Sequence, residues 1–178
     1  MIQEIIHVYL MPGMAASSII FENIDLPKVH FKVHRLEWFV PLKLESLSDY
    51  ALRMTKKVKH ENVALVGVSF GGVLVQEMSK HIKVRKLIIV SSVKSMYEIP
   101  KHMQLAKATK AYKLVPTQLA SHLDYVEKYA FGSNVKRRLE LYKKYLTISD
   151  NRYLTWAIEQ MVCWSQKEII PNIIHIHK

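Results

Sequence analysis

The chain has 178 residues, of which 49% are hydrophobic, so it is long enough and apolar enough to bury one sizeable core as a single domain. No run of 18 apolar residues occurs and no basic stretch precedes an apolar N-terminus, which argues against a transmembrane helix and a signal peptide. Cys163 is the single cysteine, so an internal disulfide is excluded and a cytoplasmic location is expected.

The net charge of +11 raises the question of a nucleic-acid partner. Residues 101–144 hold ten Lys and Arg against three Asp and Glu, which is most of the excess. Lys136-Arg137-Arg138 and Lys143-Lys144 alternate with Leu and Tyr at helical spacing, as in an amphipathic helix with a solvated basic face. We therefore expect no nucleic-acid partner and no stable insertion into a membrane.

The first predicted element is a buried strand at residues 5–10, where apolar side chains are nearly continuous. A loop with Pro12 and Gly13 follows and continues through small residues to Ser18. A second strand is predicted at residues 31–36.

A helix is predicted after the break at Pro41, with Ser48 as its cap, and it runs to about residue 60. The strands predicted after it are at residues 63–68, 86–90 and 172–177. Strands that alternate with helices indicate right-handed crossovers and a mostly parallel sheet.

A serine between glycines is the most informative feature of the chain. The strand at residues 63–68 leads into Gly67-Val68-Ser69-Phe70-Gly71-Gly72, and a helix is predicted at residues 70–81. In a G-x-S-x-G elbow the serine occupies a strained strand-to-helix turn and its hydroxyl projects above the sheet. Gly67 and Gly71 leave room where the backbones of strand and helix approach. The alternative is a glycine-rich turn without chemistry.

Between residues 91 and 168 no strand is predicted. Prolines and a glycine divide this segment into helices at residues 101–113, 117–131, 134–147 and 151–165. Asp150 is expected to cap the last of these helices.

Together, the first strand, the loop with Pro12-Gly13 and the elbow resemble the α/β-hydrolase family. The resemblance covers roughly residues 5–93 and again 169–177, and Pro12-Gly13 stands where many members have His-Gly. It implies an α/β fold with a mostly parallel sheet, flanking helices and one domain over residues 1–178. It also implies a helical lid at about residues 95–166. Four lid residues are candidates for an acyl pocket or for ordinary lid core: Tyr97, Met103, Leu105 and Tyr112.

The resemblance implies a serine hydrolase of carboxylic ester or thioester substrates that forms an acyl-serine intermediate. Ser69 is then the nucleophile, and the backbone N–H groups of Met14 and Phe70 form the oxyanion hole. The glycines of structural importance at this site are Gly13, Gly67, Gly71 and Gly72. The expected partner is a small acyl substrate, and neither a cofactor nor a metal is expected.

No general base is assigned from the sequence. In the family the acid follows the strand after the lid and the histidine lies nearer the C-terminus, so both are expected beyond Lys178. Within the chain, Asp124 or Asp150 followed by His175 or His177 satisfies the order Ser, acid, His. Both histidines, however, lie in the predicted strand at residues 172–177 and point beneath the site. His102 and His122 are further candidates for the base, but nothing in their spacing supports them. His175 and His177 could also form a metal pair, but no third ligand of suitable spacing is evident.

Three functional hypotheses stay open. The first is the serine hydrolase, with slow turnover because acid and base are not evident. The second is a catalytically dead α/β-hydrolase-like domain that binds a small molecule or a protein, and the third is an unrelated α/β binding domain with a coincidental elbow. Because the strand at residues 172–177 is expected to be an apolar sheet edge, self-association is also expected.

Overall fold

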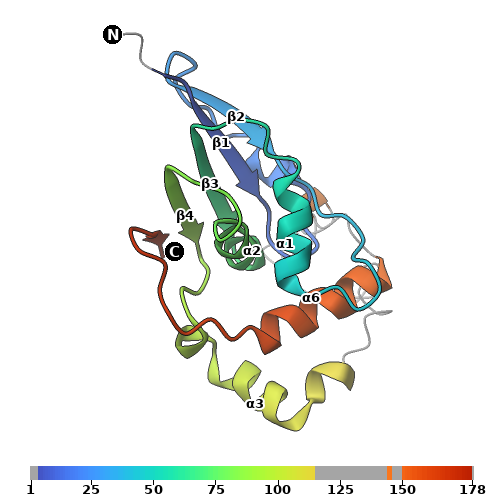
Figure 1. Ribbon diagram of the computed structural model, residues 1–178. Helices are drawn as coiled ribbons and strands as arrows, with labels where there is room; N and C mark the ends of the chain where they lie inside the picture. Colours follow the sequence, from blue (N-terminus) through green and yellow to red (C-terminus); the bar gives the residue numbers. More distant parts are fainter. Residues whose placement is uncertain (1–3, 115–143, 146–149, 178) are drawn as a thin grey trace, which may run out of the picture.

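The computed structural model describes residues 4–114, 144–145 and 150–177. Five strands form one sheet in the order β2-β1-β3-β4-β5, and every adjacent pair is parallel (Figure 1). The strands are β1 (Ile6–Met11), β2 (Phe31–Arg35), β3 (Val63–Val68), β4 (Lys86–Val90) and β5 (Ile174–Ile176). The predicted α/β class with a parallel sheet is therefore confirmed.

The register of the strands brings three loops to one edge of the sheet. Met11, the last residue of β1, pairs with Gly67, and Val68 at the end of β3 pairs with Val90 at the end of β4. Because parallel strands all end at the same edge, the segments that follow β1, β3 and β4 meet there. This edge is where the predicted elbow lies.

Four helices of regular α type are described, together with three short 3₁₀ helices. They are α1 (Leu47–Thr55), α2 (Phe70–Met78), α3 (Lys101–Thr109) and α6 (Asn151–Cys163), with η1 (Ser18–Phe21), η2 (Met96–Glu98) and η3 (Ala111–Leu114). Among the described helices, none combines the length and the apolarity that crossing a bilayer requires.

The sequence predicted Ser48 as the cap of α1, but the structure shows that the cap is Ser46. The Ser46 hydroxyl accepts a hydrogen bond from the Asp49 N–H at 3.1 Å. Leu47, the first helical residue, is buried in the core, so the helix starts early enough to place this side chain inside. The predicted cap of α6 is confirmed, because the Asp150 carboxylate accepts from the Tyr153 N–H at 2.9 Å.

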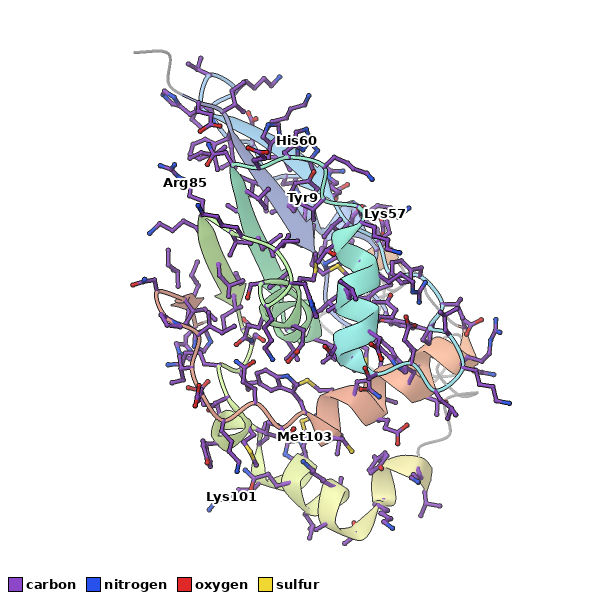
Figure 2. All side chains as sticks on the ribbon, viewed as in Figure 1. Tyr9, Lys57, His60, Arg85, Lys101 and Met103 are labelled. Atoms are coloured by element: carbon purple, nitrogen blue, oxygen red, sulfur yellow. The ribbon has the colours of Figure 1, made fainter. Side chains whose placement is uncertain are left out.

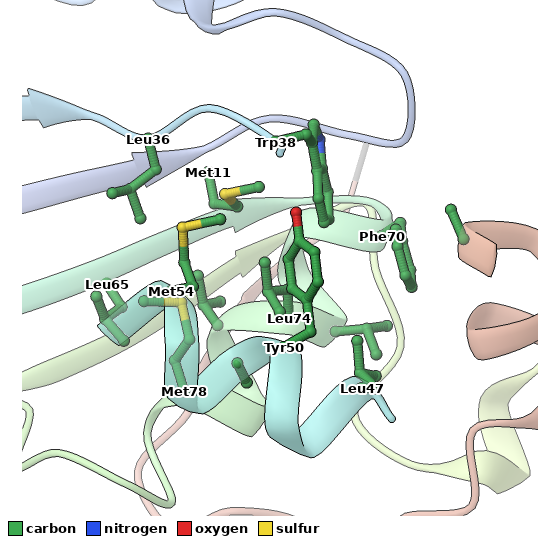
Figure 3. Close-up of a cluster of buried hydrophobic side chains, with 14 of the residues drawn as sticks. Met11, Leu36, Trp38, Leu47, Tyr50, Met54, Leu65, Phe70, Leu74 and Met78 are labelled. Carbon is green, nitrogen blue, oxygen red and sulfur yellow. The ribbon is translucent and has the colours of Figure 1, made fainter. Parts of the chain in front are cut away.

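The larger core lies between one face of the sheet and the helices α1, α2 and α6. Figure 3 shows Met11 and Leu65 of the sheet packed against Tyr50 and Met54 of α1 and against Met78 of α2. The opposite face carries a smaller core, in which Phe21 of η1 packs with Val8 and Leu10 of β1 and Ala64 of β3.

The segment expected to form a lid contains α3, η3 and α6. The helix expected at residues 117–131 and most of the helix expected at 134–147 lie outside the described residues. α3 has no buried residue, whereas α6 buries five, so α6 is the part that is anchored to the core.

Candidate active site

Ser69 occupies a strained turn between β3 and α2. Its backbone has φ 52° and ψ −121°, a conformation that costs a non-glycine residue about 1–3 kcal/mol. The Ser69 N–H donates to the Val90 carbonyl at 2.9 Å, and the Ser92 hydroxyl donates to the Ser69 carbonyl at 2.7 Å. A Cβ on Gly72 would lie 2.5 Å from Ser92 Oγ, so this glycine makes room for the hydroxyl. The elbow geometry is present, and β4 and the residues after it hold it in place.

Two of the predicted glycines are required by close backbone approach. A Cβ on Gly67 would lie 2.3 Å from the Gly71 carbonyl oxygen, within the elbow itself. A Cβ on Gly71 would lie 2.3 Å from the Pro12 carbonyl oxygen, in the loop after β1. Real Cβ atoms do not approach backbone this closely, so only glycine lets α2 start against β3 and this loop.

The loop after β1 lies beside the serine. A Cβ on Gly13 would stand 3.6 Å from Ser69 Cβ, which is ordinary contact. Among the described residues, no hydrogen-bond acceptor faces the N–H of Met14 or Phe70. Phe70 is the first residue of α2, and N–H groups of a first turn have no acceptor within the helix. One amide without an acceptor in the described part of the chain thus lies in the loop after β1 and the other in the elbow.

Two buried aromatic residues fix the loop after β1. Trp38 Nε1 donates to the Gly13 carbonyl at 2.8 Å, and its ring stacks on Phe70 with centroids 5.2 Å apart. The Tyr153 hydroxyl on α6 accepts from the Ala15 N–H at 3.2 Å. Trp38, Tyr153 and Ser92 were missed in the sequence because each stands outside a motif, and only the tertiary contacts identify them.

The Ser69 side chain is exposed, and its hydroxyl has no hydrogen-bond partner among the described residues. The acid candidate Asp150 is engaged in capping α6. His102 lies exposed on α3, and Asp124 and His122 fall outside the described residues. Within the described residues, none of the candidates in the order Ser, acid, His forms a hydrogen bond with the Ser69 hydroxyl.

The two C-terminal histidines are placed differently from the prediction. β5 covers only Ile174–Ile176, because Asn172 adopts a left-handed turn with φ 58° that delays the strand. His175 lies inside β5, paired with Ile89 of β4, while His177 follows the strand. The centroids of their rings are 3.7 Å apart. Burial is the largest cause that lowers the pKa of His175, and the charge of the nearby His177 is the next.

The predicted acyl-pocket residues do not form one group. Tyr97 and Leu105 are 70% and 64% exposed, whereas Met103 packs against the larger core. Tyr97 lines a surface cavity of about 490 Å³ beside Trp164, and Ser69 is not among the residues that line it. The assignment of an acyl pocket to these residues stays a prediction.

Comparison with known proteins gives structural likenesses only. No protein-family model matches the chain, and no curated protein sequence matches it significantly. A hydrolase from Pseudomonas aeruginosa has a TM-score of 0.65 at 11% identity, over 98% of this chain and 82% of that one.

Two further structures have similar folds and different chemistries. The NocB thioesterase domain, solved as a covalent complex with a fluorophosphonate nocardicin G analogue, has a TM-score of 0.57 at 13% identity, over 97% of this chain and 72% of that one. The bottromycin epimerase BotH, in complex with bottromycin A2, has a TM-score of 0.56 at 14% identity, over 98% and 72%. At such identities the likenesses establish the fold and leave the activity open.

Proposed function

We propose that this chain, which has the α/β-hydrolase fold, is a serine hydrolase of small carboxylic ester or thioester substrates. The observation that carries the proposal is the strained Ser69, exposed at the carboxyl edge of the sheet beside the loop after β1. Strain of this kind persists only where the surrounding structure imposes it, and it gathers at functional sites. The likeness to a hydrolase and to a thioesterase domain supports the same class.

In the proposed reaction Ser69 Oγ attacks the carbonyl carbon of the acyl group and gives up its proton to a general base. The amides of Met14 and Phe70 donate hydrogen bonds to the oxyanion that forms, and each such donor is worth about 3 kcal/mol in the transition state. Collapse of this intermediate breaks the bond to the alcohol or thiol, which takes the proton, and leaves an acyl-serine. Water then hydrolyses the acyl-serine and restores Ser69. Because no base contacts Ser69 within the described residues, we expect slow turnover.

The test is covalent labelling with a fluorophosphonate, followed by peptide mass spectrometry. We expect one adduct, on Ser69, which is lost in Ser69→Ala and kept in the control Ser165→Ala, an exposed serine after α6. Hydrolysis of p-nitrophenyl acetate and of an acyl thioester should fall to background in Ser69→Ala. Equal labelling and equal turnover in Ser69→Ala would rule out the proposed nucleophile.

The second candidate is a catalytically dead domain that binds a small molecule or a protein. It is favoured by the absence of a base beside Ser69 within the described residues and by the likeness to an epimerase. The two candidates differ in one measurement. A binding domain leaves the fluorophosphonate unreacted, yet its thermal midpoint rises with acyl ligands equally in the wild type and in Ser69→Ala.

The helical segment at residues 95–166 is proposed to act as the lid of this site within a single domain. α6 supports this role, because Tyr153 binds the loop after β1 and Trp156 Nε1 donates to the Glu45 carbonyl at 2.7 Å. Crosslinking α3, which has no buried residue, to the anchored α6 should slow labelling of Ser69 by bulky fluorophosphonates more than by small ones. Equal slowing of both sizes would contradict a lid.

Self-association and a cytoplasmic location complete the proposal. β5 forms one edge of the described sheet, and its Ile174 and Ile176 are 41% and 49% exposed. An apolar edge strand is a template for pairing, so a dimer is expected by light scattering, and a stable monomer would contradict it. The free Cys163 suits a reducing compartment, which cell fractionation tests.

A further inference from the structure

Three histidines converge at the amino-terminal end of the sheet. His7 lies on β1, His34 on β2 and His60 in the segment that leads into β3. Each offers a ring nitrogen, and these nitrogens all lie within 4.8 Å of one another. His7 pairs with Val63, six residues before Ser69, so the cluster is about 20 Å from the elbow at 3.3 Å per residue.

The three rings are packed against one another. His7 Nδ1 lies 2.9 Å from His34 Nε2, and the rings of His7 and His60 stack with centroids 3.5 Å apart and an interplanar angle of 8°. All three histidines are half-buried, so the cluster is accessible to solvent, and one ion binds all three once the His7 and His60 rings turn out of their parallel stack.

The buried Tyr9 contacts the cluster and can orient one of its rings. It is paired with His34 in the sheet, and its hydroxyl lies 2.7 Å from His60 Nδ1 (Figure 2). The same oxygen accepts the Lys59 N–H at 3.0 Å. In the tautomer that carries its proton on Nδ1, His60 donates a hydrogen bond to this oxygen, which leaves His60 Nε2 free to bind a metal.

We propose that His7, His34 and His60 form a binding site for a divalent transition metal, with Zn²⁺ as the ion that fits best. Three imidazoles with an open fourth position match zinc, whereas Mg²⁺ and Ca²⁺ require oxygen ligands. Tetrahedral bonds of 2.0–2.1 Å place ligand nitrogens about 3.4 Å apart. His7 Nδ1 and His34 Nε2 are 2.9 Å apart, and the ligand nitrogens of all three histidines lie within 4.8 Å of one another.

The surroundings contain charges of both signs. Lys32 is close enough to lower the pKa of His7 and opposes a bound cation, whereas Glu4 acts on His7 in the opposite sense. Glu4 and His60 both line a surface cavity of about 650 Å³. A metal here joins β1, β2 and the segment before β3, and this stabilises the fold by mass action.

The site is tested on tag-free, metal-stripped protein by calorimetric titration with ZnCl₂ and by the absorption spectrum with Co²⁺. We expect one ion per chain, a Kd of about 10 μM or lower, and Co²⁺ bands in the visible region. His60→Ala and His34→Ala should each weaken binding by about 100-fold, and Tyr9→Phe by about 10-fold. Zinc should also raise the thermal midpoint of the wild type and leave that of His60→Ala unchanged.

Matched controls separate this cluster from other histidines. His81→Ala, at an exposed position after α2, and the double variant His175→Ala/His177→Ala should bind as the wild type does. Circular dichroism of the metal-free variants checks the fold, and if His34→Ala does not fold, the half-exposed His60→Ala decides. Wild-type affinity in His60→Ala, loss of binding in the His175/His177 variant, or no binding below 100 μM would each overturn the proposal.

Discussion

Ser69 has both an accessible hydroxyl, which a nucleophile needs, and an unfavourable backbone conformation. Its hydroxyl is exposed and has no partner among the residues that the structure describes, while its φ of 52° is one that L side chains rarely adopt. Glycine tolerates this region without a steric penalty, whereas alanine keeps the strain. Substitution by glycine and by alanine therefore distinguishes the contribution of the Ser69 hydroxyl to activity from the cost of the backbone strain in stability.

Ser69→Gly should be more stable than Ser69→Ala by about 1 kcal/mol, because only the glycine relieves the backbone strain. Both variants should lose fluorophosphonate labelling. Urea unfolding at neutral pH measures the free energy difference. Equal stability of the two variants would mean that the turn stores no strain at this residue.

The environment of Glu45 implies that the free energy of unfolding depends on pH. Burial alone would raise the pKa of its carboxyl, but hydrogen bonds from Arg53 at 2.8 and 2.6 Å and from the Leu42 N–H at 2.7 Å hold it below the usual 4.5. A lowered folded-state pKa means that the unfolded chain binds the proton more readily. This contribution is thus complete above about pH 4.5 and is lost as the pH falls through the lower folded value.

Glu45→Gln should cost about 1.5–3 kcal/mol of unfolding free energy at pH 7, as for hydrogen bonds to charged groups. The difference from the wild type should shrink toward pH 3, where the wild-type carboxyl is itself becoming protonated. Urea unfolding at both pH values measures it, with the exposed Glu168→Gln as control. A difference that stays constant with pH would contradict the role of the carboxylate charge.

Two glycines, Gly71 of α2 and Gly13 of the loop after β1, have different surroundings. A Cβ on Gly71 meets the Pro12 carbonyl oxygen at 2.3 Å, whereas a Cβ on Gly13 meets its nearest atoms at 3.6 Å. Gly71→Ala should therefore destabilise the fold by about 3 kcal/mol through overpacking. Gly13→Ala should change stability by less than about 1 kcal/mol, because its contacts are ordinary.

Thermal unfolding of the two variants measures this pair of effects, and Gly13→Ala also has a functional readout. Its methyl group stands beside Ser69 Cβ, so labelling of Ser69 should slow although the fold is retained. If Gly13→Ala destabilised the chain as much as Gly71→Ala, the placement of this loop would be wrong.

α6 contacts the loop after β1 through Tyr153, so a substitution there should affect both stability and the labelling of Ser69. The buried Tyr153 hydroxyl accepts the Ala15 N–H, and Ala15 itself has a φ of 61°. Tyr153→Phe leaves this amide without its partner at a cost of about 1–2 kcal/mol. The rate of Ser69 labelling should fall with it, whereas Tyr97→Phe, at an exposed ring after β4, should change neither quantity.

The sheet separates two sites by its length. Ser69 lies at the carboxyl edge and the histidine cluster at the amino edge, about 20 Å away along the strands. Sites this far apart with no shared partner contribute additively to stability. The double variant Ser69→Ala/His60→Ala should show the sum of the single changes to within about 0.5 kcal/mol. Calorimetric unfolding without metal measures the sum, and a larger coupling would show that the two edges communicate.

Local patterns in the sequence predicted the elements of this molecule well. The strands at residues 63–68 and 86–90, the elbow glycines and the Asp150 cap were all found, because each depends on neighbours within a few residues. The start of α1 was predicted two residues too late, because Ser48 was taken as the cap that Ser46 provides. There the burial of Leu47 in the core decided where α1 begins.

Only the tertiary structure brought together residues from distant parts of the chain. His7 and His34 are 27 residues apart, and Tyr153 is 138 residues from Ala15, so no local pattern connects them. The sequence by itself determined the α/β class and the strained serine turn, since periodicity and turn chemistry are local properties. The strand order and register decided which side chains meet, and these depend on packing across the whole sheet.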